Sequence, residues 1–442
     1  VHDDAGLRAR FLASLAFELT GGQQHTLAEI DADMALEHPM MRLVQGDVGC
    51  GKTVVAAAAA LTAVAAGQQV AVMAPTELLA EQHRESFFRW FDPLDVRVGW
   101  LTGSLRGKAR NRVLQELAEG TTQVVVGTHA LFQEGVDYRQ LGLVIVDEQH
   151  RFGVHQRLEL MNKGRQGELR PHQLVMTATP IPRTLAMTLY ADLDVSAIRE
   201  LPPGRQPVQT VALAEERRSD VLARVREACA EGRRAYWVCP LIEDSDAIES
   251  QAVESTHRLL TEVLGDIPVG LVHGRMKPEQ KDRTMKAFAT GKLRVLVATT
   301  VIEVGVDVPE ATLMIIENAE RMGLSQLHQL RGRVGRGSES SACVLLYRSP
   351  LSRLARERLD TMRRVSDGFE LARKDLELRG PGEVLGTRQT GLMQLRVADL
   401  VRDADLAGRV QAMGQELLRI RPRAADAIIA RWVGGARDFG KV

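Results

Sequence analysis

Short runs of apolar residues alternate with segments of helical periodicity through the first 200 residues of the chain. A fully apolar run is typical of a parallel strand that is buried between layers of helices. Because helical segments separate these runs, the pattern predicts a parallel sheet with crossover helices. The predicted strands are residues 40–44, 69–74, 96–101, 123–127, 143–146 and 173–176.

The segment Leu201-Pro202-Pro203-Gly204-Arg205 interrupts this alternation with residues that continue neither a helix nor a central strand. We place a domain boundary there, because a second alternating series follows, with predicted strands at 235–239, 269–272, 294–298, 313–316 and 342–347. After about residue 350 the spacing becomes helical and rich in charge. The chain is therefore predicted to be α/β, with two tandem parallel-sheet domains (1–200 and 201–350) and a mostly helical C-terminal unit (351–442).

The composition argues against a metal-cluster protein and a membrane-spanning protein, but it does not indicate a particular function. The 442 residues carry 57 basic and 57 acidic side chains, so any contact with nucleic acid must come from local patches. The four cysteines form no Cys-x-x-Cys pair, which argues against a metal cluster and fits a reducing cytoplasm. The most apolar stretch, residues 54–66, is too short to cross a bilayer. We expect a soluble cytoplasmic protein with no membrane partner.

A glycine-rich segment between the first predicted strand and an alanine-rich helix has the pattern of a phosphate-binding loop. Its glycines allow backbone N–H groups to surround a triphosphate, Lys52 can reach the β- and γ-phosphates, and the Thr53 hydroxyl can ligate Mg²⁺. The alternative is an ordinary glycine-rich turn between a strand and a helix. The segment reads Gly46-Asp47-Val48-Gly49-Cys50-Gly51-Lys52-Thr53.

An acidic pair, Asp147-Glu148, ends the fully apolar run 143–146. Ligands of open parallel sheets bind beyond the carboxyl ends of the strands, where these two carboxylates should lie. Asp147 can hold the Mg²⁺ hydration shell, and Glu148 can orient or deprotonate the attacking water. Such a pair alone is usually a solvated turn, but together with the loop it predicts nucleotide hydrolysis.

The segment Gln329-Leu330-Arg331-Gly332-Arg333-Val334-Gly335-Arg336-Gly337 supplies cations from the second domain. Its alternative is a solvated basic turn. We expect Arg333 and Arg336 to act as arginine fingers on the γ-phosphate, because the first domain provides a loop, a metal ligand and a base but no such cation. A site that is completed only when two domains close couples hydrolysis to domain movement, which indicates a motor on a polymer.

These motifs, in this order, resemble those of superfamily 2 helicases and, within them, the RecG family of branch-migrating DNA translocases. The resemblance covers nearly the whole chain and implies that both α/β domains are RecA-like. Besides the loop and the arginine segment, the motifs are Phe17-x-Leu19-Thr20-x-x-Gln23, Ala74-Pro75-Thr76, Thr102-Gly103-Ser104, Gly127-Thr128-His129, Asp147-Glu148-Gln149-His150, Thr177-Ala178-Thr179 and Ala298-Thr299-Thr300 through Gly305-Val306-Asp307.

The resemblance assigns several residues to ATP. Gln23 can pair with adenine N6 and N7, and Phe17 can stack on the base, which would select ATP over GTP. Without the family, Gln23 would be a surface residue at a helix start after Thr20. Cys50 stands where serine is more usual in the loop, a change that should preserve the backbone cradle. The expected ATP-binding residues are Phe17, Thr20, Gln23, Gly46, Gly49, Cys50, Gly51, Lys52, Thr53, Gly305 and Asp307, and the expected catalytic residues also include Gln329.

Other residues are assigned by the resemblance to DNA or to the coupling of hydrolysis with movement. In the family the hydroxyl-bearing motifs contact the phosphodiester backbone, although such residues are usually caps or turn formers. The C-terminal unit resembles a translocation motif that RecG shares with the transcription-repair coupling factor, although its arginines taken alone would be helix-surface charges. The assigned residues are Thr76, Thr102, Gly103, Thr128, His129, Thr177, Thr179, Thr299, Arg358, Arg379 and Gln389.

The resemblance implies an ATP- and Mg²⁺-dependent translocase on double-stranded and branched DNA. We expect it to remodel stalled replication forks and Holliday junctions in recombination and DNA repair, as a monomer, with single-stranded DNA-binding protein as a candidate partner. RecG proteins carry an N-terminal wedge domain that this sequence lacks, so we expect a motor fragment. The alternatives are a transcription-repair coupling type of translocase and a nucleotide-gated DNA clamp that does not step.

Overall fold

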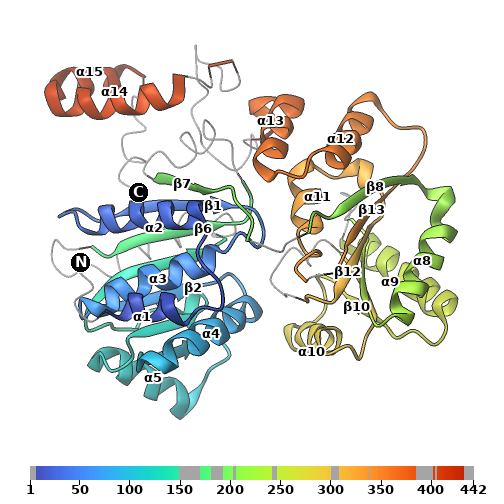
Figure 1. The fold of residues 1–442 in the computed structure, drawn as a ribbon, viewed down its shortest axis with the longest axis horizontal. Helices are drawn as coiled ribbons and strands as arrows, with labels where there is room; N and C mark the ends of the chain where they lie inside the picture. The colour runs from blue at the N-terminus through green and yellow to red at the C-terminus, as the bar shows by residue number, and fades with distance from the viewer. Residues whose placement is uncertain are drawn as a thin grey trace.

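A computed structural model describes residues 6–148, 170–180, 193–202, 206–240, 246–299, 308–337, 339–384, 402–403 and 406–432. Two α/β domains lie side by side, and further helices lie above them (Figure 1). In these ranges, no helix combines the length and apolar character that crossing a membrane requires. The predicted α/β class with two parallel sheets and a helical C-terminal region is confirmed.

The first domain is built on a seven-stranded parallel sheet with the strand order β3-β4-β2-β5-β6-β1-β7. Every residue of β5 is buried, as expected for a strand that helices cover on both faces. Each strand predicted in this domain overlaps an observed one, and β7 was not predicted. The strands are β1 (Met41–Gly46), β2 (Gln69–Met73), β3 (Val98–Leu101), β4 (Val124–Gly127), β5 (Leu141–Asp147), β6 (His172–Thr177) and β7 (Asp194–Ile198).

The helix that follows the phosphate loop is apolar nearly all round, and it is buried along almost its whole length. Its alanines allow close approach to the sheet and to the two helices that precede β1. A buried arginine fixes one of these helices, α2, to the sheet: Arg42 on β1 lies 2.6 Å from Asp33 of α2 and 2.8 Å from Ser196 of β7. The helices are α1 (Leu7–Ser14), α2 (Gly21–Met34), α3 (Lys52–Ala65), α4 (Glu77–Phe91) and α5 (Gly107–Glu119).

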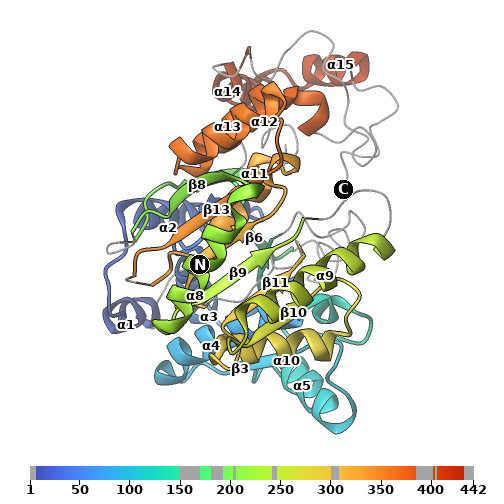
Figure 2. The ribbon, with the colours of Figure 1, turned by 90° about the vertical axis from the view of Figure 1, so that its right-hand side faces the viewer.

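The second domain contains a six-stranded parallel sheet with the order β10-β11-β9-β12-β13-β8. Helices α8 and α9 lie on the side that faces away from the first domain (Figures 1 and 2). The elements are β8 (Gln209–Ala214), α8 (Arg218–Ala230), β9 (Arg234–Val238), α9 (Asp246–Leu264), β10 (Val269–Val272), α10 (Pro278–Ala289), β11 (Val295–Ala298), β12 (Ala311–Ile316), α11 (Leu324–Arg331) and β13 (Ala342–Tyr347).

The C-terminal region is helical, as the charge-rich spacing predicted. Helices α12 and α13 pack against α11 of the second domain, and the buried Leu359, Met362 and Leu371 join its hydrophobic core. Helices α14 and α15 pack on each other and lie above the first domain in Figure 1. The four helices are α12 (Arg353–Arg364), α13 (Gly368–Val384), α14 (Ala407–Ile420) and α15 (Pro422–Trp432).

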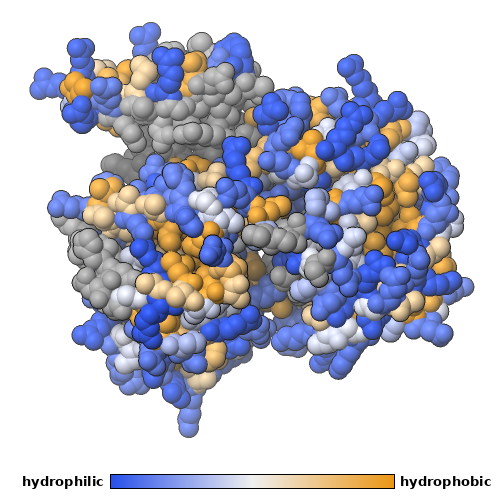
Figure 3. Space-filling view, viewed as in Figure 1, coloured by the Kyte–Doolittle hydropathy of each residue, from blue (hydrophilic) through white to orange (hydrophobic). Residues whose placement is uncertain are grey.

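The segment 199–208 joins the two sheets, from the end of β7 to the start of β8. Its first residue, Arg199, places its guanidinium 4.9 Å from the ring centre of Phe369 in α13, and Glu200 Oε2 accepts a hydrogen bond of 3.0 Å from the Gly22 N–H in α2. The predicted domain boundary at residue 200 lies in this segment; the domain limits themselves stay a prediction. The surface in Figure 3 is mostly hydrophilic, with hydrophobic side chains gathered over each domain.

Candidate nucleotide site and nucleic-acid interface

A cavity of about 630 Å³ lies between the two α/β domains. The phosphate loop, the acidic pair and α4 line it from the first domain, and the arginine segment lines it from the second. The lining residues Gly49 and Arg336 are 287 positions apart in the sequence (336 − 49), and the fold brings their motifs to one cavity. The predicted residues that line it are Gly49, Gly51, Lys52, Thr53, Asp147, Glu148, Gln329, Arg333 and Arg336.

The phosphate loop joins the end of β1 to the start of α3. Gly51 has a φ of 84°, in the left-handed region that favours glycine, and a Cβ there would collide with the Gln23 amide. The buried Lys52 ammonium donates hydrogen bonds to the carbonyls of Gly46 (2.7 Å) and Asp47 (3.0 Å). The lysine is therefore held inside the loop, and the loop precedes a helix N-terminus, where anions bind favourably.

Asp147 at the end of β5 has both carboxylate oxygens engaged. Oδ2 lies 2.8 Å from Nε2 of His83, and Oδ1 accepts the Glu148 N–H at 3.0 Å. Burial raises the pKa of Asp147, but the hydrogen bond and charge of His83, the charge of Lys52 and the Glu148 N–H outweigh it and leave the pKa below its usual value. Asp147 is thus an ionised oxygen donor beside the loop, and His83 was not anticipated from the sequence.

The pKa of Glu148 is shifted in the opposite direction to that of Asp147. It adopts a positive φ of 52°, its N–H donates to the Met176 carbonyl at 2.9 Å, and its carboxylate accepts the Ala178 N–H at 3.3 Å. Burial and the charge of Asp147 raise its pKa to about 7, against the opposing charges of Lys52 and Arg333. A carboxylate with this pKa is suited to take a proton near neutral pH.

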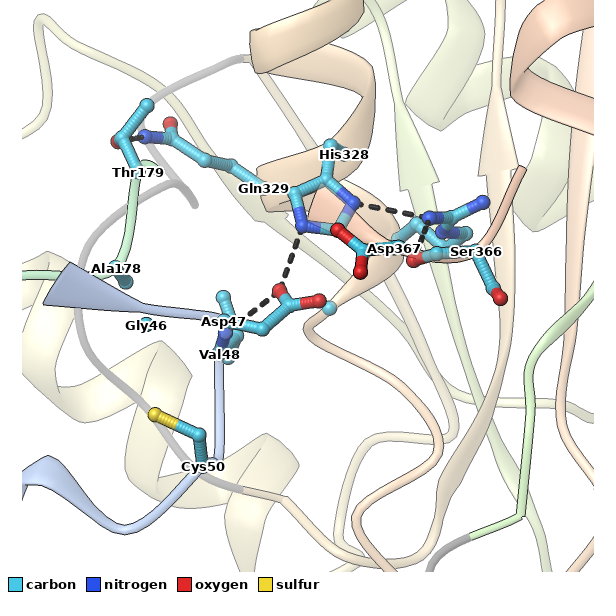
Figure 4. A network of polar contacts seen from close by, with 12 residues as sticks. Gly46, Asp47, Val48, Cys50, Ala178, Thr179, His328, Gln329, Ser366 and Asp367 are labelled. Carbon is cyan, nitrogen blue, oxygen red and sulfur yellow. Dashed lines mark hydrogen bonds and ion pairs between the residues drawn. The ribbon is translucent and has the colours of Figure 1, made fainter. Parts of the chain in front are cut away.

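The second domain contacts the first through Gln329 and His328 of α11 (Figure 4). Gln329 Nε2 donates to the Thr179 hydroxyl, and the Thr179 N–H donates to Thr177 Oγ1 at 3.1 Å. Since Thr177 Oγ1 also lies 3.5 Å from Glu148 Oε2, a chain of polar contacts connects the second domain to Glu148. The predicted Gln329, Thr177 and Thr179 are therefore neighbours.

His328 makes the second contact. Its Nε2 lies 2.6 Å from Asp47 Oδ1 in the phosphate loop, and its Nδ1 lies 3.0 Å from Nη2 of Arg331. Arg331 is buried and donates further hydrogen bonds to the carbonyls of Met362 (3.1 Å), Val365 (2.8 Å) and Ser366 (2.9 Å), between α12 and α13. The loop is thus joined to the C-terminal helices through two side chains.

Gln23, which is expected to pair with adenine, lies beside the loop. Thr20 caps α2 in a capping box with Gln23, as the alternative interpretation of Gln23 supposed. Gln23 is nevertheless buried, and its Nε2 donates to the Cys50 carbonyl at 2.8 Å. Phe17 is 48% exposed, and Cys50 is fully buried. Gly305 and Asp307 lie outside the described residues.

Several residues expected to contact DNA follow strand ends of the first sheet. Thr76 caps α4 by accepting the Leu79 N–H at 3.3 Å, and Thr128 precedes a short 3₁₀ turn that starts at His129. Thr102 Oγ1 lies 2.9 Å from Ser104 Oγ. A Cβ on Gly103 would meet no atom within 4 Å, so its backbone is open to a ligand.

In the second domain, Thr299 is buried after β11, and its hydroxyl has no hydrogen-bond partner among the described residues. Arg358 donates to the carbonyls of Met322 (3.0 Å) and Glu320 (2.7 Å), which fixes α12 to the second domain. Arg379 belongs to α13, but its side chain is outside what the structure describes, and Gln389 lies outside the described residues.

Family models of helicases match three parts of the chain. The DEAD/DEAH box helicase model matches residues 20–188, the helicase conserved C-terminal domain matches 220–338, and the C-terminal part of domain 3 of the ATP-dependent DNA helicase RecG matches 365–430. An ATP-dependent DNA helicase RecG of Escherichia coli is 60% identical over 428 residues, which are 97% of this chain and 62% of the relative.

The corresponding protein of Haemophilus influenzae is 57% identical over 440 residues, 99% of this chain and 64% of the relative. A solved structure of RecG bound to a three-way DNA junction matches with a TM-score of 0.77 at 44% identity, covering 91% of this chain and 52% of that one. This chain spans less than two thirds of the length of these relatives.

Proposed function

The chain belongs to the RecG family of ATP-dependent DNA helicases, and on this premise we propose that it is an ATP-driven motor that moves along double-stranded DNA. One observation carries the proposal: the phosphate loop, the acidic pair and two arginines of the other domain line a single cavity. A nucleotide bound there contacts both domains, so its hydrolysis changes how they are held together.

Five residues that line the cavity have a role in this proposal. Lys52 exchanges its contacts with the loop carbonyls for phosphate oxygens, and Glu148 takes a proton from the attacking water. Arg333 and Arg336 stabilise the charge that develops on the γ-phosphate, a contribution on the order of a thousandfold in rate. Gln329, in the helix that precedes these arginines, connects the second domain to the 177–179 segment and so to Glu148.

The cofactor Mg²⁺ fits the residues present. Mg²⁺ prefers oxygen ligands and is usually held by one or two carboxylates together with substrate phosphates. Asp147 offers an ionised carboxylate and Thr53 a hydroxyl, and the described residues contain no group of three or more His, Cys, Asp or Glu side chains that could form a separate cage. Bound Mg²⁺ would neutralise phosphate charge.

ATP is the proposed nucleotide because the Gln23 amide retains the groups that adenine requires. Its Oε1 already accepts the Thr20 N–H at 2.9 Å, and its Nε2 donates to Cys50 O, but an amide has a second lone pair and a second N–H. These remaining groups can pair with adenine N6 and N7, whereas the guanine edge presents a carbonyl in place of the N6 amine.

We extend the proposal to branched DNA, with stalled forks and Holliday junctions as substrates of the longer protein. The support is the solved RecG structure, which is bound to a three-way DNA junction. Hydroxyls at the strand ends would contact the phosphate backbone without reading sequence. Action in the cytoplasm, a monomeric state and binding to single-stranded DNA-binding protein stay predictions.

The test is ATP turnover by this chain with and without linear or branched duplex DNA, at stated salt. We expect duplex DNA to stimulate turnover, and Glu148→Gln to lower it by a factor on the order of 10²–10⁴ while ATP binding persists. Glu134→Gln, at an exposed position outside the cavity, is the matched control. Near-normal turnover by Glu148→Gln would refute the assigned base.

Displacement of a third strand from duplex DNA separates a motor from a clamp. A translocating motor strips the third strand as it advances, whereas a nucleotide-gated clamp hydrolyses ATP and leaves the triplex intact. Release that requires ATP and is lost in Lys52→Ala supports the proposal. ATP turnover without any release would favour the clamp.

A further inference from the structure

Helix α4 runs along the interdomain cavity, and its buried His83 holds Asp147. The His83 side chain is only 6% exposed, and its Nε2 lies 2.8 Å from Asp147 Oδ2. Because an ionised carboxylate only accepts hydrogen bonds, Nε2 carries the proton and donates it. With Oδ1 bound to the Glu148 N–H, the plane of the carboxylate is fixed at both oxygens.

The N-terminal end of the same helix holds a residue that we expect to contact DNA. Thr76 is its N-cap, and the Glu77 carboxylate accepts hydrogen bonds from the Ser104 N–H (3.1 Å) and the Ser104 hydroxyl (2.9 Å). Ser104 in turn lies against Thr102. A helix rises about 1.5 Å per residue, so only about 9 Å of rigid rod separates Glu77 from His83.

Helix α4 also contacts the second domain. Glu81 Oε2 lies 3.3 Å from the ammonium of Lys286 in α10, and Leu78 packs against the hydrophobic core of the second domain. The position of α4 therefore depends on how the two domains meet. Because packed elements shift as rigid units and do not deform continuously, a helix that packs on both domains can transmit a displacement from one of its ends to the other.

We propose that α4 couples the cluster Thr76, Glu77, Thr102 and Ser104, of which Thr76 and Thr102 are expected to contact DNA, to the metal-ligand carboxylate, with His83 as the positioning residue that orients Asp147. This inference rests on the proposed ATP-driven function. Without His83, Oδ2 of Asp147 loses its partner, and the carboxylate is free to turn away from the bound nucleotide. Partners that orient metal ligands typically contribute ten- to a hundredfold to metal affinity.

The experiment compares His83→Leu, which removes the donor, with His83→Gln, which keeps an N–H donor, in the full 442-residue chain. His38→Leu, at an exposed histidine, is the matched control. Binding of a fluorescent ATP analogue is titrated with Mg²⁺, which requires neither turnover nor DNA. We expect His83→Leu to need about tenfold more Mg²⁺ or higher, and His83→Gln to recover part of the loss.

A second readout is the ratio of ATP turnover with duplex DNA to turnover without it, which we expect to fall at least threefold in His83→Leu. A folded His83→Leu chain with an unchanged Mg²⁺ titration and an unchanged ratio overturns the inference.

If His83→Leu does not fold, Glu77→Ala tests the other end of α4. This variant should lower the ratio of turnover with DNA to turnover without it and leave the Mg²⁺ titration intact. An unchanged ratio overturns the coupling. Failure of the unmodified chain to bind the analogue would count against the proposed function instead.

Discussion

His328 and Asp47 join the two α/β domains, with 2.6 Å between Nε2 and Oδ1. The other ring nitrogen, Nδ1, faces Arg331, whose guanidinium has donors only. Nδ1 must therefore accept, which leaves the proton on Nε2 and makes the imidazole a neutral bridge. Gly368 at the start of α13 permits this arrangement, because a Cβ there would lie 2.5 Å from His328 Nε2.

We expect His328→Ala to impair coupling more than ATP binding. The change removes the bridge between the phosphate loop and Arg331, and with it the connection to the C-terminal helices. DNA-stimulated ATP turnover should fall roughly two- to thirtyfold, the usual range for residues that carry coupling. Fluorescent ATP binding serves as the comparison, and His38→Ala as the control. Equal losses of binding and turnover would contradict a role in coupling.

The raised pKa of Glu148 predicts how ATP turnover depends on pH. A general base works in its deprotonated form, so kcat/KM should rise as pH increases through about 7 and reach a plateau above it. Below that value kcat/KM should fall about tenfold per pH unit. The profile is measured between pH 5.5 and 9 at constant ionic strength. A profile that stays flat down to pH 5.5 would mean that Glu148 is not the titrating base.

Gln23→Ala should reduce the preference for ATP over GTP. The change removes both amide groups that can pair with adenine and also the contact with Cys50 O. Bidentate base pairing of this kind is worth about 1–3 kcal/mol, so we expect roughly tenfold or greater loss of discrimination. Competition of ATP and GTP for a fluorescent nucleotide measures it. Retained discrimination would show that Gln23 serves the helix cap and the loop alone.

Gly46→Ala should destabilise the first domain. A Cβ at this position would lie 2.5 Å from Cys50 Sγ and 2.8 Å from the Ile198 carbonyl, and the latter belongs to the backbone and cannot move aside easily. Overpacking of this kind costs about 1–3 kcal/mol. Thermal unfolding followed by circular dichroism should show a lower midpoint. Gly414→Ala, where a Cβ meets no atom within 4 Å, is the control that should show no decrease.

The central strands could be predicted from the sequence because central parallel strands are continuously apolar, as β5 is. The two unpredicted strands, β7 and β8, are edge strands, and most of their residues are exposed or only partly buried. The sequence of β7, Asp194–Ile198, alternates exposed and buried positions over only five residues, and β8 opens on an exposed glutamine. Such short runs carry little periodicity.

The candidate site was predictable where its chemistry is contiguous in sequence, as in the phosphate loop and the acidic pair. The contacts that orient it were not. His83 and Asp147 are 64 residues apart, and His328 and Asp47 are 281 apart. Each histidine lies in a helix, and its partner is set by tertiary packing: within the first domain for His83, and between the two domains for His328. A buried histidine near a motif is the one signal that could have drawn attention to them.

The segment 199–208 gives the two domains a one-sided tether. It leaves the first sheet from its margin at β7 and enters the second at its margin at β8, and its start is pinned by Phe369 and Gly22. If one domain rotates relative to the other about this segment, the strands at the opposite edges of the two sheets, β3 and β10, move the farthest. Thr102 follows β3, whereas Gln23 lies close to the pinned end. Under the proposed motor function, a swing about this segment would therefore displace Thr102 farther than Gln23.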